Sequence, residues 1–130
     1  MKYYAQNIEK ETLENENFRK VIFTGEKSQL VLMSIEVGGE IGKEVHPKVD
    51  QFFRIESGKG KLIINGEEVE VEDDFAIIVP AGAEHNIMNT GDTPLKLYTI
   101  YSPANHIDGR IHKTRADADM DTEDEEFGHQ

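Results

Sequence analysis

Short apolar runs bounded by glycines and polar residues fill the chain from Phe18 to Pro103. No apolar pattern with a helical period separates these runs. They occupy residues 18–25, 28–37, 51–57, 61–66, 67–72, 75–80, 86–89 and 95–102. Many short strands with regular turn signals are typical of an all-β sandwich or barrel. The pattern therefore predicts an all-β fold.

One hairpin can be located within this series. Asn65-Gly66 separates two β-rich runs, and Asn-Gly is a strong signal for a tight turn between antiparallel strands. The run that follows alternates strictly between acidic and apolar residues. Side chains alternate between the two faces of a strand, so we expect Val69 and Val71 to face the core.

The chain divides into four segments by composition. Residues 1–17 form a polar lead-in with a short helical turn around Ile8–Glu14, and residues 18–103 form the barrel. A polar arm follows over residues 104–115. Residues 116–130 are an acidic tail that is poor in apolar side chains. Such a segment buries too little apolar area to offset its ordering entropy, so we expect the tail to be disordered.

The arm carries local positive charge between His106 and Arg115, with one acid, Asp108. Its charged and titratable side chains include His106, Arg110, His112, Lys113 and Arg115. The segment could fold over the barrel mouth and meet an anionic substrate. Packing of the arm against the barrel or against a partner subunit is the reading we favour.

Charge and composition exclude several classes of function. The formal charge is −12, and seven of the 26 acids lie in the last fifteen residues, which hold no Lys or Arg. The rest of the chain is only mildly acidic and has no basic patch, so we expect binding neither to nucleic acid nor to an anionic membrane. Cysteine is absent, and no apolar run approaches the length of a bilayer span. We therefore expect a cytoplasmic protein.

Four residues of two short segments could ligate a metal ion. Glu44 and His46 point to the same side of an extended chain, and Gln51 begins the next apolar strand. His85 follows a tight turn marked by Pro80 and Gly82. Two histidines and a carboxylate form the facial triad of non-haem iron, and the same set can bind zinc. Taken singly, either histidine is more often a surface or capping residue.

The same segments resemble the two motifs of the cupin superfamily. The stretch that ends at Gly58 is similar to G-x5-H-x-H-x4-E-x6-G, and Gly38 fits as its opening glycine. In this alignment Glu44 and Gln51 replace the usual histidine and glutamate. The stretch after Asp74 resembles G-x5-P-x-G-x2-H-x3-N, with Asp74 in the place of the opening glycine. The matching residues of this second motif are Pro80, Gly82, His85 and Asn89.

The resemblance implies a fold and a metal site. Cupins are double-stranded β-helices, or jelly-roll barrels, that commonly pair as homodimers. Carried over residue by residue, the ligands of one divalent ion (zinc, iron, manganese or nickel) would be Glu44, His46, Gln51 and His85. The exchange of histidine for Glu44 and of glutamate for Gln51 leaves the formal charge of the site unchanged. The β-rich run 18–25 needs a sheet to join, which agrees with pairing between subunits.

Three functions remain open at this stage. The chain resembles small microbial cupins described as mannose-6-phosphate-isomerase-like, so the leading hypothesis is metal-dependent chemistry on, or binding of, a small polar molecule such as a sugar or sugar phosphate. A metal-dependent oxygenase is the first alternative, because two histidines and a carboxylate leave positions for dioxygen and substrate. A non-catalytic ligand-binding barrel is the second. No catalytic residue can be assigned, and no proton donor is evident from the sequence.

Overall fold

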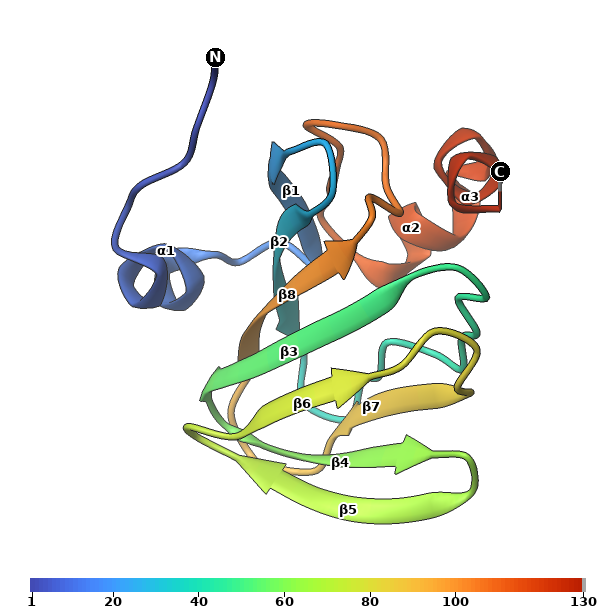
Figure 1. Ribbon diagram of the computed structural model, residues 1–130. Coiled ribbons are helices and arrows are strands. Elements are labelled where there is room, and N and C mark those ends of the chain that lie inside the picture. Colours follow the sequence, from blue (N-terminus) through green and yellow to red (C-terminus); the bar gives the residue numbers. More distant parts are fainter. Residues whose placement is uncertain (130) are drawn as a thin grey trace.

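Two antiparallel sheets form the body of the molecule in the computed structural model, which describes residues 1–129. The larger sheet has the strand order β6-β3-β8-β2-β1-β9 and the smaller has the order β5-β4-β7 (Figure 1). The strands are β1 (Arg19–Thr24), β2 (Gln29–Ile35), β3 (Asp50–Ser57), β4 (Lys59–Ile64), β5 (Glu67–Glu72), β6 (Ala76–Val79), β7 (His85–Asn89), β8 (Leu95–Ser102) and β9 (Ile111–His112). The all-β, double-stranded β-helix predicted from the sequence is confirmed.

Alternating side chains place the core between the two sheets. In β8 every second residue is buried, so Leu95, Leu97, Thr99 and Tyr101 face inward. They meet the fully buried side chains of the neighbouring strands, among them Phe53. Burial of each large apolar side chain contributes roughly 1.5–3 kcal/mol, and this packing fixes the register that aims polar residues into the barrel.

The predicted hairpin between β4 and β5 is present. Asn65 and Gly66 both adopt positive φ angles, 48° and 82°, as a type I′ turn requires. Val71 is buried as expected, but the prediction for Val69 is wrong, because that side chain is 41% exposed. Val69 lies on β5, an edge strand of the smaller sheet, where the partner strand β4 covers one side alone.

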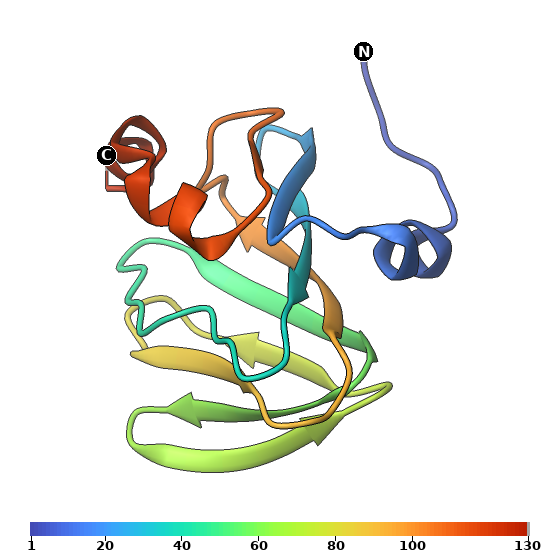
Figure 2. The ribbon, with the colours of Figure 1, turned by 180° about the vertical axis from the view of Figure 1, so that it is seen from behind.

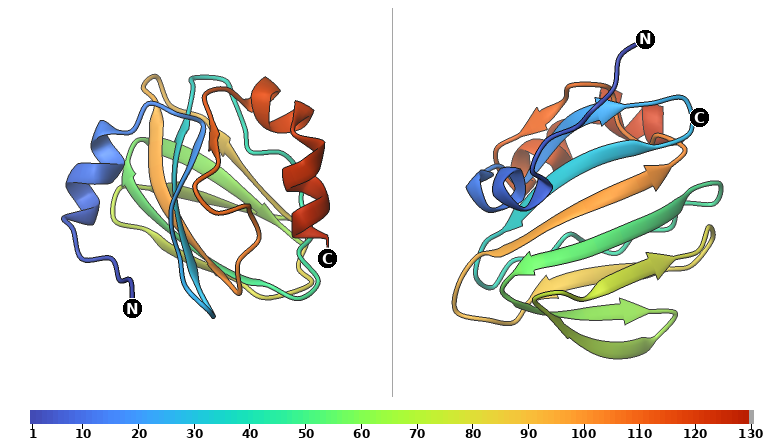
Figure 3. Two further views of the ribbon diagram at one scale, coloured as in Figure 1. Left: turned by 90° about the horizontal axis from the view of Figure 1, so that it is seen from above. Right: turned by 60° about the vertical axis from the view of Figure 1, so that its left-hand side comes forward.

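The N-terminal helix forms where the sequence predicts it. Helix α1 covers Ile8–Glu14, and the side chain of Asn7 caps it by accepting a hydrogen bond from the Lys10 amide. The helix packs against β8, β3 and β2, on the opposite side of the molecule from the C-terminal helices (Figure 3). Lys96 of β8 donates a hydrogen bond to the Asn15 carbonyl just after the helix.

The acidic tail is ordered, which corrects the expectation of disorder over residues 116–130. Helices α2 (Arg115–Met120) and α3 (Thr122–Gly128) lie against the barrel at its open end (Figure 2). Thr114 and Asp117 form a capping box at the start of α2. Several of the acids that argued for disorder find partners on the arm, so their charge stabilises docking instead of opposing it. Only Gln130 falls outside the described residues.

The arm that precedes the tail packs on the barrel of its own chain. Strand β9 pairs with the beginning of β1, and Arg19 lies opposite His112 in this pairing. Strand β1 also pairs with β2 along its length, so the run 18–25 has its sheet without a second subunit. That part of the argument for a homodimer no longer stands, and the dimer stays a prediction. Within residues 1–129, no helix has the length and apolar content needed to cross a membrane.

Candidate metal centre

Backbone hydrogen bonds join the two segments that carry the candidate ligands. Glu44 and His85 exchange both of their N–H···O=C bonds, at 2.9 and 3.0 Å, and the Gly82 amide donates to the His46 carbonyl at 2.9 Å. The two segments therefore run as a short antiparallel ladder. As a result, the ligand atoms of Glu44, His46 and His85 lie within 4.8 Å of one another.

Gln51 lies on β3 and directs its side chain toward the same group of ligand atoms from inside the barrel. Its side chain is 2% exposed, and its Nε2 donates to the Thr99 hydroxyl at 3.0 Å. That hydroxyl in turn donates to the Phe52 carbonyl at 2.8 Å, so it can only accept from Gln51. The amide is thereby held with Oε1 toward His85 Nε2, 3.2 Å away. The structure brings together all four residues singled out from the sequence.

The proton positions leave two lone pairs facing each other. His85 Nδ1 lies 3.1 Å from the Ala83 carbonyl oxygen, which can only accept, so this nitrogen carries a proton. Burial lowers the pKa of His85, which keeps the ring neutral and leaves Nε2 unprotonated. Nε2 and Gln51 Oε1 are then both acceptors, and two ligands of one ion stand roughly 3 Å apart when each bond is about 2.1 Å. A cation between them would relieve this contact, so the donor set fits a metal.

Glu44 supplies the negative charge of the group. Burial alone would raise the pKa of this carboxyl, but a hydrogen bond from His46 at 2.9 Å and the positive charge of Arg19 lower the pKa overall. Glu44 is therefore ionised at neutral pH. One carboxylate, two imidazoles and one amide oxygen form a nitrogen and oxygen donor set suited to zinc, iron, manganese or nickel.

The other motif residues hold these segments in shape. The buried side chain of Asn89 donates to the carbonyls of Ile35 and Thr93 at 3.0 and 2.9 Å. Asp74, which occupies the place of a motif glycine, has a φ of 70°, a conformation for which glycine is usual. Aspartate tolerates this conformation better than most residues, and its carboxylate pairs with Arg54 at 3.0 Å.

Comparison with known proteins agrees with this fold. The family model for the cupin domain matches residues 31–101, more than half of the chain. The chain belongs to the cupin family. The Bacillus subtilis protein YrkC, which is described as uncharacterized, is 48% identical over 90% of this cupin and 66% of its own length. The chain thus spans about two thirds of that relative.

A solved structure and a more distant relative extend the comparison. The crystal structure of BH2720 from Bacillus halodurans superposes on this cupin with a TM-score of 0.89 and 46% identity, covering 90% of this chain and 93% of the other. Mannose-1-phosphate guanylyltransferase of Klebsiella pneumoniae is 27% identical over 54% of the chain, but this match covers 15% of the enzyme.

A cavity of about 350 Å³ opens between the cupin barrel and the docked tail. Glu44 and His46 line it from the barrel, and Asp124 lines it from α3. Arg19 and His106 also line it, and neither was assigned to a site from the sequence. Arg19 lies on the same face of β1 as Val21, and a charged residue among inward-facing apolar ones is a signal that could have been read.

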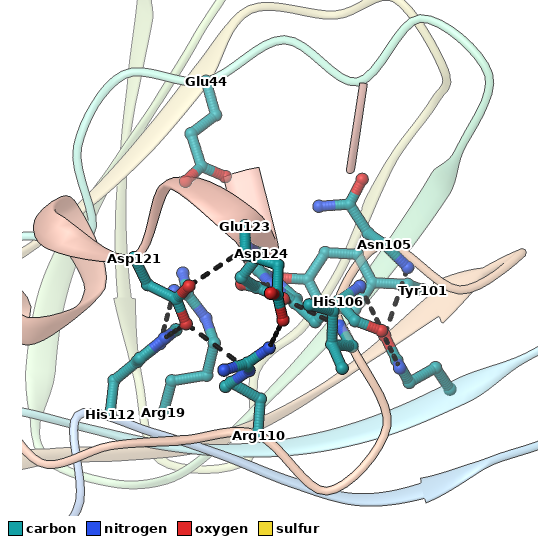
Figure 4. A network of polar contacts seen from close by, with 12 residues as sticks. Arg19, Glu44, Tyr101, Asn105, His106, Arg110, His112, Asp121, Glu123 and Asp124 are labelled. Carbon is teal, nitrogen blue, oxygen red and sulfur yellow. Dashed lines mark hydrogen bonds and ion pairs between the residues drawn. The ribbon is translucent and has the colours of Figure 1, made fainter. Parts of the chain in front are cut away.

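Three residues connect the tail to the floor of the cupin barrel (Figure 4). His106 Nδ1 donates to Asp124 Oδ2 at 2.7 Å, and the Tyr101 hydroxyl donates to His106 Nε2 at 3.1 Å. Burial lowers the pKa of His106, although Asp124 opposes this effect, and burial raises the pKa of Tyr101. Burial would raise the pKa of Asp124, but the hydrogen bond from His106 lowers it overall. This hydrogen-bonded series therefore consists of a carboxylate on Asp124, a neutral imidazole on His106 and a phenol on Tyr101.

A second group of acids and histidine lies beside this series. His112, Asp121 and Asp124 offer ligand atoms within 4.8 Å of one another. However, Asp121 already accepts from His112 Nε2 at 2.9 Å and lies 3.4 Å from Arg110 Nε. A guanidinium at this point opposes a further cation, so the group serves to dock the tail.

Proposed function

We propose that this cupin binds one divalent metal ion through Glu44, His46, Gln51 and His85, and acts on a small polar molecule held at that ion. The observation that carries the proposal is the convergence of these side chains, with 3.2 Å between Gln51 Oε1 and His85 Nε2. Two acceptors this close are stabilised by a cation between them. Glu44 adds the single anionic ligand.

A sugar or sugar phosphate is the substrate class that we favour, with an isomerase-like reaction. A cavity of about 350 Å³ is at the small end of ligand sites, which supports a molecule of this size. The mannose-1-phosphate guanylyltransferase similarity supports the mannose-6-phosphate-isomerase-like assignment, and it is a distant one. When bound, the metal would polarise a carbonyl or orient a hydroxyl of the substrate.

His106 is the residue that we propose to hold and move a proton. Its ring lines the cavity, and Asp124 fixes the proton on Nδ1 so that Nε2 is the basic atom. In this structure Nε2 accepts a hydrogen bond from the Tyr101 hydroxyl, so the imidazole and the phenol would act together. This pair favours an enzyme over the non-catalytic barrel, which remains the alternative along with a metal-dependent oxygenase.

Metal analysis of variants tests the proposal. His46→Ala and His85→Ala should each abolish stoichiometric metal binding, as measured by elemental analysis after dialysis against low free metal. Gln51→Ala should weaken binding less, because a neutral amide contributes less electrostatic energy. Glu84→Gln is a matched control, since Glu84 neighbours His85 but pairs with Lys43 at the surface. Full metal content in either histidine variant would contradict the ligand assignment.

The metal found also separates the alternatives. Iron in protein purified without added metal would favour the oxygenase, whereas zinc would favour the isomerase or a structural ion.

We further propose a cytoplasmic homodimer, on the basis of the cupin family's common pairing and the absence of cysteine. Light scattering at micromolar concentration tests the dimer, and a mass of one chain would contradict it.

A further inference from the structure

Arg19 is a buried cation without a counter-ion in direct contact. Its side chain begins β1, and the residue is 5% exposed. Within residues 1–129, no carboxylate forms an ion pair with its guanidinium, and its buried Nε has no hydrogen-bond partner. Removing a charge from water is costly unless the charge is paired, and the carboxylates of Glu44 and Asp124 act on this charge only from a distance. The guanidinium therefore lacks a partner in direct contact.

The one polar contact of the guanidinium is not a charge pair. Arg19 Nη1 donates to His112 Nδ1 at 3.4 Å, and His112 Nε2 donates to Asp121. A guanidinium can only donate, so His112 Nδ1 accepts through its lone pair in this contact. The guanidinium also lies 5.2 Å from the centre of the Phe18 ring, which is another uncharged neighbour. Four of its five N–H groups remain without an acceptor among the described residues.

The position of Arg19 relates it to the metal centre. Arg19 and Phe18 line the same cavity as Glu44 and His46, and the tail forms the opposite wall. Figure 4 shows Arg19 beside His112 and beneath the tail, with the Glu44 side chain directed toward this group. A molecule that occupies a cavity of about 350 Å³ and contacts the metal centre would lie within reach of the guanidinium.

We propose that Arg19 binds the oxyanion head group, a carboxylate or a phosphate, of the molecule held at the metal centre. This inference rests on the proposed function and adds the charge of the substrate. The planar guanidinium matches both head groups, because it can donate two parallel hydrogen bonds to a pair of oxygens. The rest of the molecule would extend toward Glu44, His46 and His85.

Calorimetric titration with three small probes tests this proposal. Lactate carries a carboxylate, inorganic phosphate carries the other head group, and lactamide is the neutral analogue of lactate. Each is titrated into zinc-loaded and into chelator-treated protein. We expect one of the anions to bind at least about tenfold more tightly than lactamide, since hydrogen bonds to charged groups are the stronger ones. The anion that binds identifies the head group.

Variants assign the effect to the guanidinium. Arg19→Gln should lower the affinity for the anion by about tenfold or more and leave the affinity for lactamide unchanged. Arg19→Lys keeps the positive charge but lacks the two parallel N–H donors of the guanidinium, so it should lower the affinity for the anion by a smaller factor. This variant replaces Arg19→Gln as the test if Arg19→Gln does not fold. Lys20→Gln is the control, because Lys20 follows on the same strand and lies outside the cavity lining. Unchanged anion affinity in both Arg19 variants would overturn the proposal.

Comparison of zinc-loaded with chelator-treated protein separates this inference from the metal assignment. Arg19-dependent anion binding by protein that takes up no zinc would uphold the anion site and reject the metal centre. Zinc uptake with no anion binding up to millimolar concentration would reject the anion site alone. An Arg19→Gln variant whose melting temperature falls while its anion affinity holds would also reject it, because Arg19 would then only stabilise the tail.

Discussion

His106 and Asp124 meet inside the molecule, with 2.7 Å between Nδ1 and Oδ2, although 18 positions separate them in the chain. The other carboxylate oxygen of Asp124 accepts from the Ile107 amide, also at 2.7 Å. Both residues are less than 10% exposed. The last helix is thus fastened to the residues that leave the barrel, and it forms a wall of the cavity that Glu44 and His46 also line.

Asp124→Asn should destabilise the protein. An amide has one acceptor oxygen, so either the His106 ring or the Ile107 amide would lose its buried acceptor. A buried donor left unsatisfied costs about 1–3 kcal/mol, and we expect the free energy of unfolding in urea to fall by this amount. Asp119→Asn is the control, because Asp119 is an exposed acid of the same tail and lies 3.9 Å from Arg115. Equal stability of the two variants would contradict the role of Asp124.

Deletion of residues 116–130 should lower the melting temperature by several degrees. The deletion removes Asp124 from His106, Asp121 from His112, and Glu123 from Arg110, and it uncovers buried groups of the arm. Composition alone predicts no effect, because an acidic segment of this kind is expected to be disordered. Differential scanning calorimetry of the two proteins decides between these expectations, and an unchanged midpoint would favour the disordered tail.

Metal-free protein should lose stability as the pH falls below about 6.5. Burial lowers the pKa of both His85 and His106 relative to the unfolded chain, so the unfolded state binds more protons in this range. The free energy of unfolding then rises with pH until both histidines are neutral in both states. Urea unfolding between pH 5 and 8 measures this slope.

A variant assigns part of that slope to one residue. His106→Gln removes one of the two groups, so its slope should be smaller than that of the wild-type protein. An identical slope would show that His106 takes up its proton at an ordinary pH in the folded state.

Glu44→Gln should reduce metal affinity by a factor of ten or more, because it removes the only anionic ligand. Affinity in the wild-type protein should also fall on acidification, since metal and protons compete for the same ligand atoms. Glu44→His would restore the commoner cupin ligand and should bind metal again, with a changed preference among iron, zinc and nickel. Competitive titration against a chelator of known affinity measures each variant, and an unchanged affinity in Glu44→Gln would place Glu44 outside the metal site.

Local patterns in the sequence were enough to predict most of the strands, and together with the cupin resemblance they singled out Glu44, His46, Gln51 and His85. Glu44 and His46 share a face because strand side chains alternate, and the Asn65-Gly66 turn follows from backbone preference. The departure at Asp74 was visible as a missing glycine, and the φ of 70° explains why glycine is usual at that position. These features depend on neighbours within a few residues, so the sequence carries them directly.

Features that depend on distant partners escaped prediction. The tail was expected to be disordered because its charge was weighed without the groups that it meets. His106, Arg110 and His112 supply those partners, and nothing local links them to Asp121 or Asp124. Arg19 was passed over for the same reason, because its burial beside His112 is a property of the folded chain.

The place of His129 has a practical consequence for purification. This residue lines the same cavity as Glu44 and His46, so an affinity tag placed behind α3 is attached close to that cavity. A histidine-rich affinity tag at that end could supply its own imidazoles to the ion and give a false stoichiometry. The N-terminal residues lie on the far side of the barrel from α3, so a tag fused there leaves the cavity clear (Figure 3).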